Sequence, residues 1–514
     1  MRPLYRAALV MIAFAPAFAA AETLDEKVQR MEGELQQLKQ EMAAEKKPEP
    51  TPAPVPPVAA LAAKPEGESS GFSYRDIVDR VKLGAYGSVR FEHNTLDDIH
   101  NTFTLRRLVM TTDANIAPRL RSFFELEFER FRELEVEKDF AGTDQGFETE
   151  QAIEATNGSE IALEQVWLQY DVYDWLRMRI GGVLVPVGRF NINHDDNRWD
   201  LPRRPLVDRG SSVLPSTAAW DELGVGFNGD LELTDSLLAN YQFFVVNGVS
   251  LDFEHEQIVE TRVGDTTLNE TEVKVQPSTG TFNLDNKDGK AVTGRFALSP
   301  QLGSEIATSF YWGRYTPDFL PNENVYSLSV DGLYTWGPFA IEAEYVFTHF
   351  GGITNVAKGF AEKAINSESV NESPQLENEV EFELAGLAKD KQGYWIEARY
   401  SFWPQFLNRT PLGSYFDDPR LIAVFRPEQV WFHDLVSEID YSNSVLTGIE
   451  SESTYLNRLT WGLAYRPVPS VVFQLAFEWT FAENGTELSA VTNYLPSNGE
   501  DHCEAVLLGA AFGF

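Results

Sequence analysis

The sequence has few of the residues that form disulfides and metal sites. It contains one cysteine, Cys503, and 7 histidines in 514 residues. A single cysteine excludes an internal disulfide and any metal site built from several thiolates. So few histidines also disfavour a His-rich zinc site. No glycine-rich phosphate-binding loop is present either, so the sequence predicts neither a resident metal nor an organic cofactor.

Basic charge and long hydrophobic runs are also scarce. The 42 Lys and Arg residues are outnumbered by 78 Asp and Glu residues, which gives a net charge of -36. This balance disfavours nucleic acid as a partner, because contacts to phosphates need a basic face. After the N-terminus, no apolar run reaches the about 18 residues that a membrane-spanning helix needs. A β-barrel remains possible, because its lipid-facing residues alternate with polar ones.

Residues 1–21 are typical of a secretory signal peptide. Arg2 and Arg6 precede an apolar run, and small residues follow at which cleavage would occur after Ala19 or Ala21. The sequence therefore predicts export across an inner membrane.

Residues 22–45 follow a heptad pattern. Apolar residues recur at spacings of 4, 3, 4, 3 and 4 and form one seam: Leu24, Val28, Met31, Leu35, Leu38 and Met42. This pattern predicts a short coiled-coil helix, although it does not distinguish a dimer from a trimer. Residues 46–74 are rich in proline and alanine and predict an extended linker. Together they predict a periplasmic stalk, for which proximity to peptidoglycan is one option.

From residue 75 to 514, apolar and polar residues alternate with period 2. About sixteen runs of about 10–14 residues follow this pattern, the length that a tilted strand needs to cross a bilayer. We therefore predict an all-β protein, a transmembrane antiparallel β-barrel of about 16 strands. The runs lie near 81–91, 104–116, 120–129, 160–172, 175–186, 221–232, 238–248, 289–298, 303–314, 325–335, 338–350, 392–403, 420–432, 455–466, 469–482 and 503–514.

The links between these runs alternate between short and long, as expected for turns at one end of a barrel and loops at the other. The long links are 131–159, 187–220, 249–288, 351–391, 433–454 and 483–502. One link, from Trp403 to Arg420, should be short and is not. The run near 104–116 also has an ambiguous phase at Arg106-Arg107.

Two features indicate which face of the wall meets water and which meets lipid. Glu125, Glu127 and Glu129 occupy alternate positions of one run, which suits a water-filled lumen. The last run ends on Phe514 with an apolar face, and it resembles the C-terminal signal of bacterial outer-membrane proteins. Aromatic residues also gather near the run ends, as in the girdles at membrane interfaces.

The link 187–220 is dense in charges of both signs. It carries Arg189, Arg198, Arg203, Arg204 and Arg209 with Asp195, Asp196, Asp200 and Asp208. We interpret it as a pore constriction that filters solutes by size and charge. Arginines on the inward phase of nearby strands are expected to line the same lumen: Arg90, Arg121, Arg177 and Arg179. Alternatively, the charges form salt bridges that anchor the loop, and the two roles are compatible.

Other sites can be assembled from the same link. His194, Asp195, Asp196 and Asp200 offer ligands for calcium, although such clusters in loops are usually only solvated. Ser211 and His194 with an aspartate could form a catalytic triad, but nothing in the sequence positions them. We expect no enzymatic activity. The rival functions are a barrel that tethers a stalk to the cell wall and a barrel enzyme such as a lipid hydrolase.

Two segments carry a family resemblance. RLVMTTDANIAPRLRSFFELEFE (107–129) and GGVLVPVGRFNINHDDNRWDLPRRPLVDR (181–209) resemble the phosphate-selective porin O and P family of Gram-negative outer-membrane porins. The resemblance implies a homotrimer of sixteen-stranded barrels in the outer membrane, in contact with lipid and lipopolysaccharide. It also implies a loop folded into each lumen and passive diffusion of small ions and hydrophilic solutes. The family name implies phosphate or anion selectivity, whereas Glu125, Glu127 and Glu129 favour general diffusion.

Overall fold

The computed structural model describes residues 80–95, 100–130, 134–143, 146–155, 160–208, 213–216, 219–263, 266–278, 287–365, 379–384, 387–442, 445–483 and 501–514. These residues belong to one compact unit, which runs from Phe72 to Phe514. The predicted signal peptide, coiled coil and linker, residues 1–74, all lie outside the described residues.

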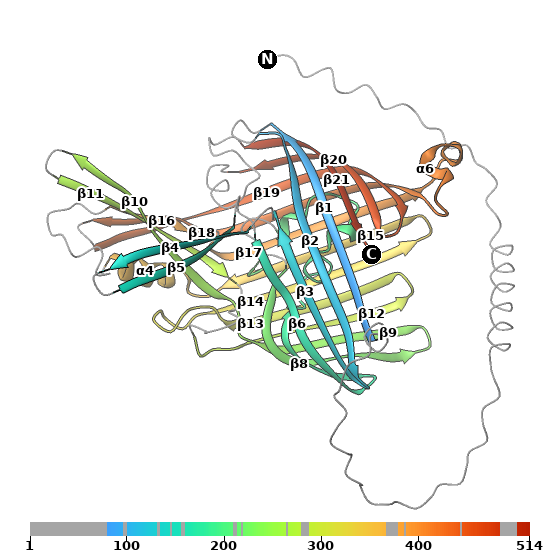
Figure 1. Ribbon diagram of the computed structural model, residues 1–514, viewed down its shortest axis with the longest axis horizontal. Helices are drawn as coiled ribbons and strands as arrows, with labels where there is room; N and C mark the ends of the chain where they lie inside the picture. The colour runs from blue at the N-terminus through green and yellow to red at the C-terminus, as the bar shows by residue number, and fades with distance from the viewer. Residues whose placement is uncertain are drawn as a thin grey trace, which may run out of the picture. The chain divides into compact units, whose positions relative to one another are not determined.

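Sixteen antiparallel strands form a closed barrel (Figure 1). In order around the ring they are β1 (Val81–Asn94), β2 (Thr102–Ala117), β3 (Leu120–Glu129), β6 (Glu160–Tyr173), β7 (Leu176–Leu184), β8 (Asp221–Thr234), β9 (Leu237–Val246), β12 (Ala291–Gln301), β13 (Ser304–Arg314), β14 (Asn324–Trp336), β15 (Phe339–Phe350), β17 (Ala388–Phe402), β18 (Arg420–Ser442), β19 (Val445–Val468), β20 (Val471–Ala482) and β21 (His502–Gly513). The ring closes where β1 pairs with β21, with Tyr86 opposite Gly513. The predicted fold class and strand number are confirmed.

Further strands lie outside the ring, in links that the sequence predicted as loops. β4 (Leu134–Thr143) and β5 (Gly146–Ala155) form a hairpin between β3 and β6. β10 (Ser250–Val263), β11 (Thr266–Ser278) and β16 (Glu379–Leu384) form a three-stranded sheet. β11 and β16 pair in parallel, so this sheet joins two links that are far apart in the sequence.

The hairpin of β18 and β19 is longer than predicted. The sequence indicated strands near 420–432 and 455–466 with a loop between them, but pairing continues to Ser442 and Val445. Residues 450–453 of this extension are all exposed. Where both faces of a hairpin meet water, the apolar alternation that reveals a strand disappears. The extension therefore carried no pattern that could be recognised.

Helical segments are few among the described residues. α3 (Arg189–Ile192) and the 3₁₀ turns η2 (Asp196–Arg198) and η3 (Leu206–Asp208) lie between β7 and β8, and α4 (Ile353–Ile365) follows β15. The irregular link from Trp403 to Arg420 holds η4 (Gln405–Arg409) and α6 (Pro411–Ser414), which explains its length. None of the described helices is long and apolar enough to span a bilayer.

The two faces of the barrel wall differ in polarity. Large apolar side chains such as Phe103, Leu508 and Phe512 are exposed on the outward face. Charged side chains such as Glu397 and Arg458 are buried on the inward face. This inverts the usual order of a water-soluble protein, and it is typical of a barrel whose outer surface meets lipid.

We expect that Leu508→Arg destabilises the barrel by about 2–4 kcal/mol, because it places a charge on the lipid-facing side of a strand. The measurement is equilibrium unfolding by urea in lipid vesicles. Thr111→Arg is the matched control, since Thr111 borders a cavity inside the barrel and should tolerate a charged side chain. Equal destabilisation by the two substitutions would contradict the assignment of the faces.

Candidate functional site

The described part of the segment between β7 and β8, residues 185–208, 213–216 and 219–220, lies inside the barrel, and we call it the lumen loop. At one point the Phe190 amide donates to Glu344 of β15 over 3.0 Å. At another the Trp199 carbonyl accepts a 2.8 Å hydrogen bond from Gln474 of β20. Because β15 and β20 are separated around the ring, the loop has to cross the lumen.

The first anchor of the lumen loop is Arg189 in α3. Its guanidinium binds three inward carboxylates, those of Glu342, Glu305 (2.8 Å) and Asp331 (3.5 Å). The preceding Gly188 has a φ of 81°, and a Cβ atom there would lie 2.5 Å from a neighbouring carboxylate oxygen. Only glycine combines this backbone conformation with such a close approach. The turn at Gly188 therefore places Arg189 among its partners.

The second anchor is a buried charge triad on β18 and β19. Glu428 lies 2.9 Å from Arg426 and 3.0 Å from Arg458, and all three side chains are fully buried. The two arginines also donate to main-chain carbonyls of the lumen loop, those of Arg203 (2.7 Å) and Arg204 (2.6 Å). Wall charges thus hold the loop backbone at the point where two of the predicted arginines project.

The third anchor is Asp200, which accepts from Arg466 at 2.7 Å and lies 3.8 Å from Arg399. Arg466 also donates to the carbonyls of Asn197 (3.0 Å) and Trp199 (3.1 Å). Loop side chains and loop backbone are therefore bound by the same wall residue.

Apolar packing supports these ion pairs. Phe190 and Leu206 of the lumen loop belong to a large buried cluster with wall residues that include Trp395 and Phe432. Leu201 belongs to a second cluster, with inward side chains of β18 to β21. The contact of the lumen loop with these wall residues therefore excludes water over much of its area.

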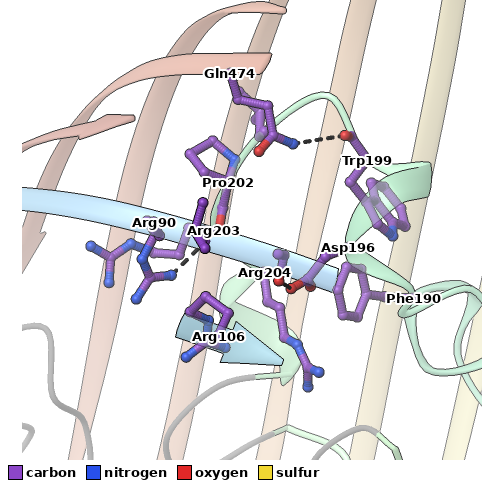
Figure 2. Close-up of a pocket in the computed structure, with 12 residues that line it drawn as sticks. Arg90, Arg106, Phe190, Asp196, Trp199, Pro202, Arg203, Arg204 and Gln474 are labelled. Carbon is purple, nitrogen blue, oxygen red and sulfur yellow. Dashed lines mark hydrogen bonds between the residues drawn. The ribbon is translucent and has the colours of Figure 1, made fainter. Parts of the chain in front are cut away.

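Four arginines border a small cavity of about 20 Å³ beside β1 and β2 (Figure 2): Arg90, Arg106, Arg203 and Arg204. Arg203 lies 2.5 Å from Glu92 and 2.6 Å from Glu478. The carboxylates that pair with the four arginines are Glu92, Glu129, Asp208 and Glu478. The four arginines of this cavity, which we call the outer cavity, are therefore paired, although the carboxylate that lines the cavity itself is that of Asp196.

A β-bulge in β2 turns two adjacent arginines inward. The register of β1 and β2 shifts between Ser88 and Val89, which leaves Arg106 as the extra residue. Both Arg106 and Arg107 are consequently buried on the inner face. The bulge explains the ambiguous phase of this segment in the sequence. It also brings Arg107 to 3.6 Å from Asp196 of the lumen loop.

A second bulge lies in β6. The register of β3 and β6 shifts between Glu125 and Leu126, so Glu164 is the extra residue and is buried. Glu164 lies 3.4 Å from His194 Nε2, while His194 Nδ1 lies 2.7 Å from the Asn191 carbonyl. Burial alone would lower the pKa of His194, but the Glu164 carboxylate outweighs it and raises the pKa to about 10. His194 is therefore a buried cation at neutral pH.

Three other predicted arginines lie on the wall near the short turns: Arg121, Arg177 and Arg179. Two of them form 2.7 Å ion pairs with the wall aspartates Asp113 and Asp230. The third, Arg179, lies 4.0 Å from the centroid of the Trp167 ring. They lie at a different level from the arginines of the outer cavity, and a role in lining the pore stays a prediction for them.

Most of the predicted charges in the described residues form ion pairs, which is the geometry that the anchoring alternative requires. Even the exposed Arg198 forms a 3.0 Å ion pair with Asp195, and Glu125 and Glu127 are buried on the inner face. Positive and negative groups alternate in contact instead of separating onto opposed faces. A filtering role remains a prediction, and Arg209 lies outside the described residues.

The sequence reasoning missed most inward charges of the wall between β12 and β19. They are Arg295, Glu305, Asp331, Glu342, Glu344, Glu397, Arg399, Arg426, Glu428, Arg458 and Arg466. A signal was available, because Arg426 and Glu428 stand at alternate positions of a predicted strand, where inward polar residues are expected.

The other sites assembled from the sequence gain no support. Among the described residues, no group of three or more His, Cys, Asp or Glu side chains could hold a metal ion. Asp200 and Asp196 instead face arginines. Ser211, the serine of the hypothetical triad, lies outside the described residues.

No family model matches the chain. An uncharacterised protein of Aquifex aeolicus is 26% identical over 172 residues, which are 34% of this chain and 33% of the relative. The chain thus spans about a third of the length of the curated relative it matches. The resemblance to the phosphate-selective family therefore stays a prediction.

Several solved outer-membrane proteins are similar in structure. They include OmpF of Salmonella typhi in complex with daunomycin (12% identity, 84% of this chain and 97% of that chain, TM-score 0.44). The anion-selective porin of Comamonas acidovorans (9%, 84% and 99%, TM-score 0.43) and the trimer form of OmpT of Vibrio cholerae (10%, 85% and 100%, TM-score 0.42) are also similar. These identities and TM-scores are too low to transfer solute or assembly to this chain.

We expect Glu428→Gln to destabilise the protein by about 3–5 kcal/mol, because it removes the buried carboxylate shared by Arg426 and Arg458 and leaves Arg426 with the 3.4 Å ion pair to Glu397. The measurement is the urea unfolding midpoint, together with trypsin cleavage of the lumen loop. Asp418→Asn is the control, since its ion pair with Arg420 is largely exposed and should contribute about 0–1 kcal/mol. Similar effects of the two substitutions would argue against the buried anchor.

The raised pKa of His194 predicts a pH dependence of stability. A group whose pKa is higher in the folded state stabilises fully below its unfolded pKa, about 6.5, and loses that contribution as pH rises through the folded value of about 10. The unfolding midpoint of the wild type should therefore fall relative to that of His194→Gln between these two pH values. Parallel pH profiles of the two proteins would refute the ion pair with Glu164.

Proposed function

We propose that the protein is an outer-membrane porin through which small hydrophilic solutes and ions diffuse passively. The observation that carries this proposal is a cavity of about 460 Å³ between the lumen loop and the wall, lined by polar and apolar side chains from β1, β2, β3, β6, β7 and β21. Its lining includes Tyr86, Glu125, Gln165, Asp195 and Arg198. We call it the inner cavity. A lumen that is partly open and lined by hydrogen-bonding groups suits hydrated solutes rather than lipids.

General diffusion fits the described charges better than phosphate selectivity does. A phosphate path needs cations that can exchange their present partners for the anion without trapping it. Arg189, Arg203 and Arg204 instead bind carboxylates of the wall or of the loop. The anion-selective alternative would require these pairs to break during transport.

Location and assembly form part of the same proposal. The closed barrel and its exposed apolar outward face support an outer-membrane location, with lipid and lipopolysaccharide around that face. A homotrimer and a periplasmic stalk follow from the family resemblance and from the heptads of residues 22–45. Chemical cross-linking in native membranes tests the trimer.

The test of the function is conductance of the purified full-length protein in planar lipid bilayers. Stepwise, ohmic current increments in KCl are expected. Replacing residues 189–208 by a short Gly-Ser linker should raise the single-channel conductance severalfold, because it removes the loop from the lumen. No current from correctly folded wild-type protein would overturn the porin proposal.

A second experiment separates the pore from the tether. Deleting residues 22–70 should leave the single-channel conductance unchanged, since the predicted stalk precedes the barrel. Two outcomes would favour the tethering function. In the first, the deletion abolishes conductance. In the second, the full-length protein carries no current and the deletion detaches the outer membrane from the wall.

A further inference from the structure

The link between β17 and β18, residues 403–419, lies at the end of the barrel where the other described links between neighbouring strands are two residues long. Figure 1 shows its helix α6 at that end, beyond the strands. Main-chain hydrogen bonds close the link on itself: the Thr410 amide donates to the Leu407 carbonyl and the Ser414 amide to the Thr410 carbonyl, both over 2.9 Å. The link, which we call the long turn, is therefore a structured element in spite of its length.

The long turn packs on the outward face of the barrel wall. On β19, Tyr465 follows the exposed Trp461 and Leu463 at alternate positions, so its side chain also points outward. The Tyr465 hydroxyl donates to the main-chain carbonyl of Leu412 in α6. The Tyr465 ring stacks on Trp403 at the start of the turn, with the ring centroids 6.1 Å apart. Both parts of the turn are therefore fixed to the face that carries the exposed apolar side chains of the barrel.

An aromatic row joins the long turn to that face. The other neighbour of the Tyr465 ring is Phe473 of β20, which is half exposed and lies 6.2 Å away in a stacked arrangement. Trp403 is held by a 2.6 Å hydrogen bond from its Nε1 to Asn408 Oδ1. A Cβ atom at Gly413 would lie 2.9 Å from the Trp403 ring, so the close approach of α6 to this ring needs glycine. The row Trp403–Tyr465–Phe473 thus runs from the turn onto the outward wall.

Three large side chains within ten residues of the long turn are exposed. They are Phe406 (68% exposed), Leu412 (48%) and Tyr415 (79%). Exposed apolar side chains that gather on one compact element mark an interaction surface. Because the turn continues the outward face of β19 and β20, the partner that covers that face is also the nearest one to the turn.

We propose that the long turn anchors the barrel in the membrane interface, with Phe406, Leu412 and Tyr415 among the phospholipid headgroups and upper acyl chains of the adjacent leaflet. Aromatic side chains that carry a polar group favour this zone, because the ring can face lipid while the polar group faces water. The proposal goes beyond passive diffusion, and it holds or fails whether or not the barrel conducts.

The charges of the long turn indicate which property of the lipid matters. Arg409 and Arg420 at its end are balanced by Asp417 and Asp418, and Asp418 forms an ion pair with Arg420. A cluster of basic residues would instead bind anionic lipid through charge. The contact therefore rests on apolar area removed from water, so it should form in zwitterionic membranes and change little with salt.

The test places a small environment-sensitive fluorophore on the full-length protein in phosphatidylcholine vesicles. In a Cys503→Ser background, Phe406→Cys and Tyr415→Cys are labelled separately. Lipids that carry bromine on the upper acyl chain should quench both labels, and iodide on both sides of the membrane should quench them several times less than the control. Asp235→Cys is the matched control, because Asp235 is exposed in a two-residue turn at the same end of the barrel.

The proposal requires quenching by lipid at both labelled positions. Quenching by iodide as efficient as at position 235 would show that the turn lies in water. Protection from iodide and from brominated lipid together would show a protein partner, such as a second copy of the chain. Either result overturns the proposal. Near-ultraviolet circular dichroism of each labelled protein checks that the barrel is folded.

The same labelled proteins test the apolar basis of the contact. Replacing part of the phosphatidylcholine by phosphatidylglycerol, or raising the salt concentration, should leave the quenching by brominated lipid unchanged. Quenching that appears only with the anionic lipid and disappears at high salt would show that charge holds the turn at the membrane. That outcome would contradict an anchor built from Phe406, Leu412 and Tyr415.

Discussion

Charges enclosed in the barrel have to be paired, and this requirement places the lumen loop. The wall of β13 to β19 presents inward carboxylates and arginines whose burial without partners would be costly. Arg189 and Asp200 of the loop, together with its main-chain carbonyls, complete these groups. The loop and the wall are therefore mutually dependent: each supplies the counter-charges that allow the other to be buried.

The strand pattern could be predicted from the sequence because its cause is local. Each residue of a membrane-spanning strand faces either lipid or the lumen, so period 2 records the environment directly. The period-2 alternation is lost where residues do not face lipid and lumen in turn. At Arg106 a bulge adds a residue, and in the extension of β18 and β19 the lipid is absent. The anchors were beyond prediction because the Arg189 partner Glu342 is 153 residues away along the chain.

The charges of the lumen loop show why composition is a poor guide to transport. Its five arginines and four aspartates suggested a filter, yet the described ones neutralise groups on the wall or on the loop itself. What can act on a passing ion is the imbalance that remains after pairing.

The closure of the ring has a consequence for the order of folding. The β18–β19 hairpin joins adjacent segments, so forming it costs little chain entropy. The pairing of β1 with β21 joins segments about as far apart as the chain allows. The lumen loop lies against this last junction, because side chains at Gly509 and Gly513 would collide with Pro202 and Asn197. In the order that sequence separation favours, with the β1–β21 pairing last, the loop would therefore already lie inside when the barrel closes.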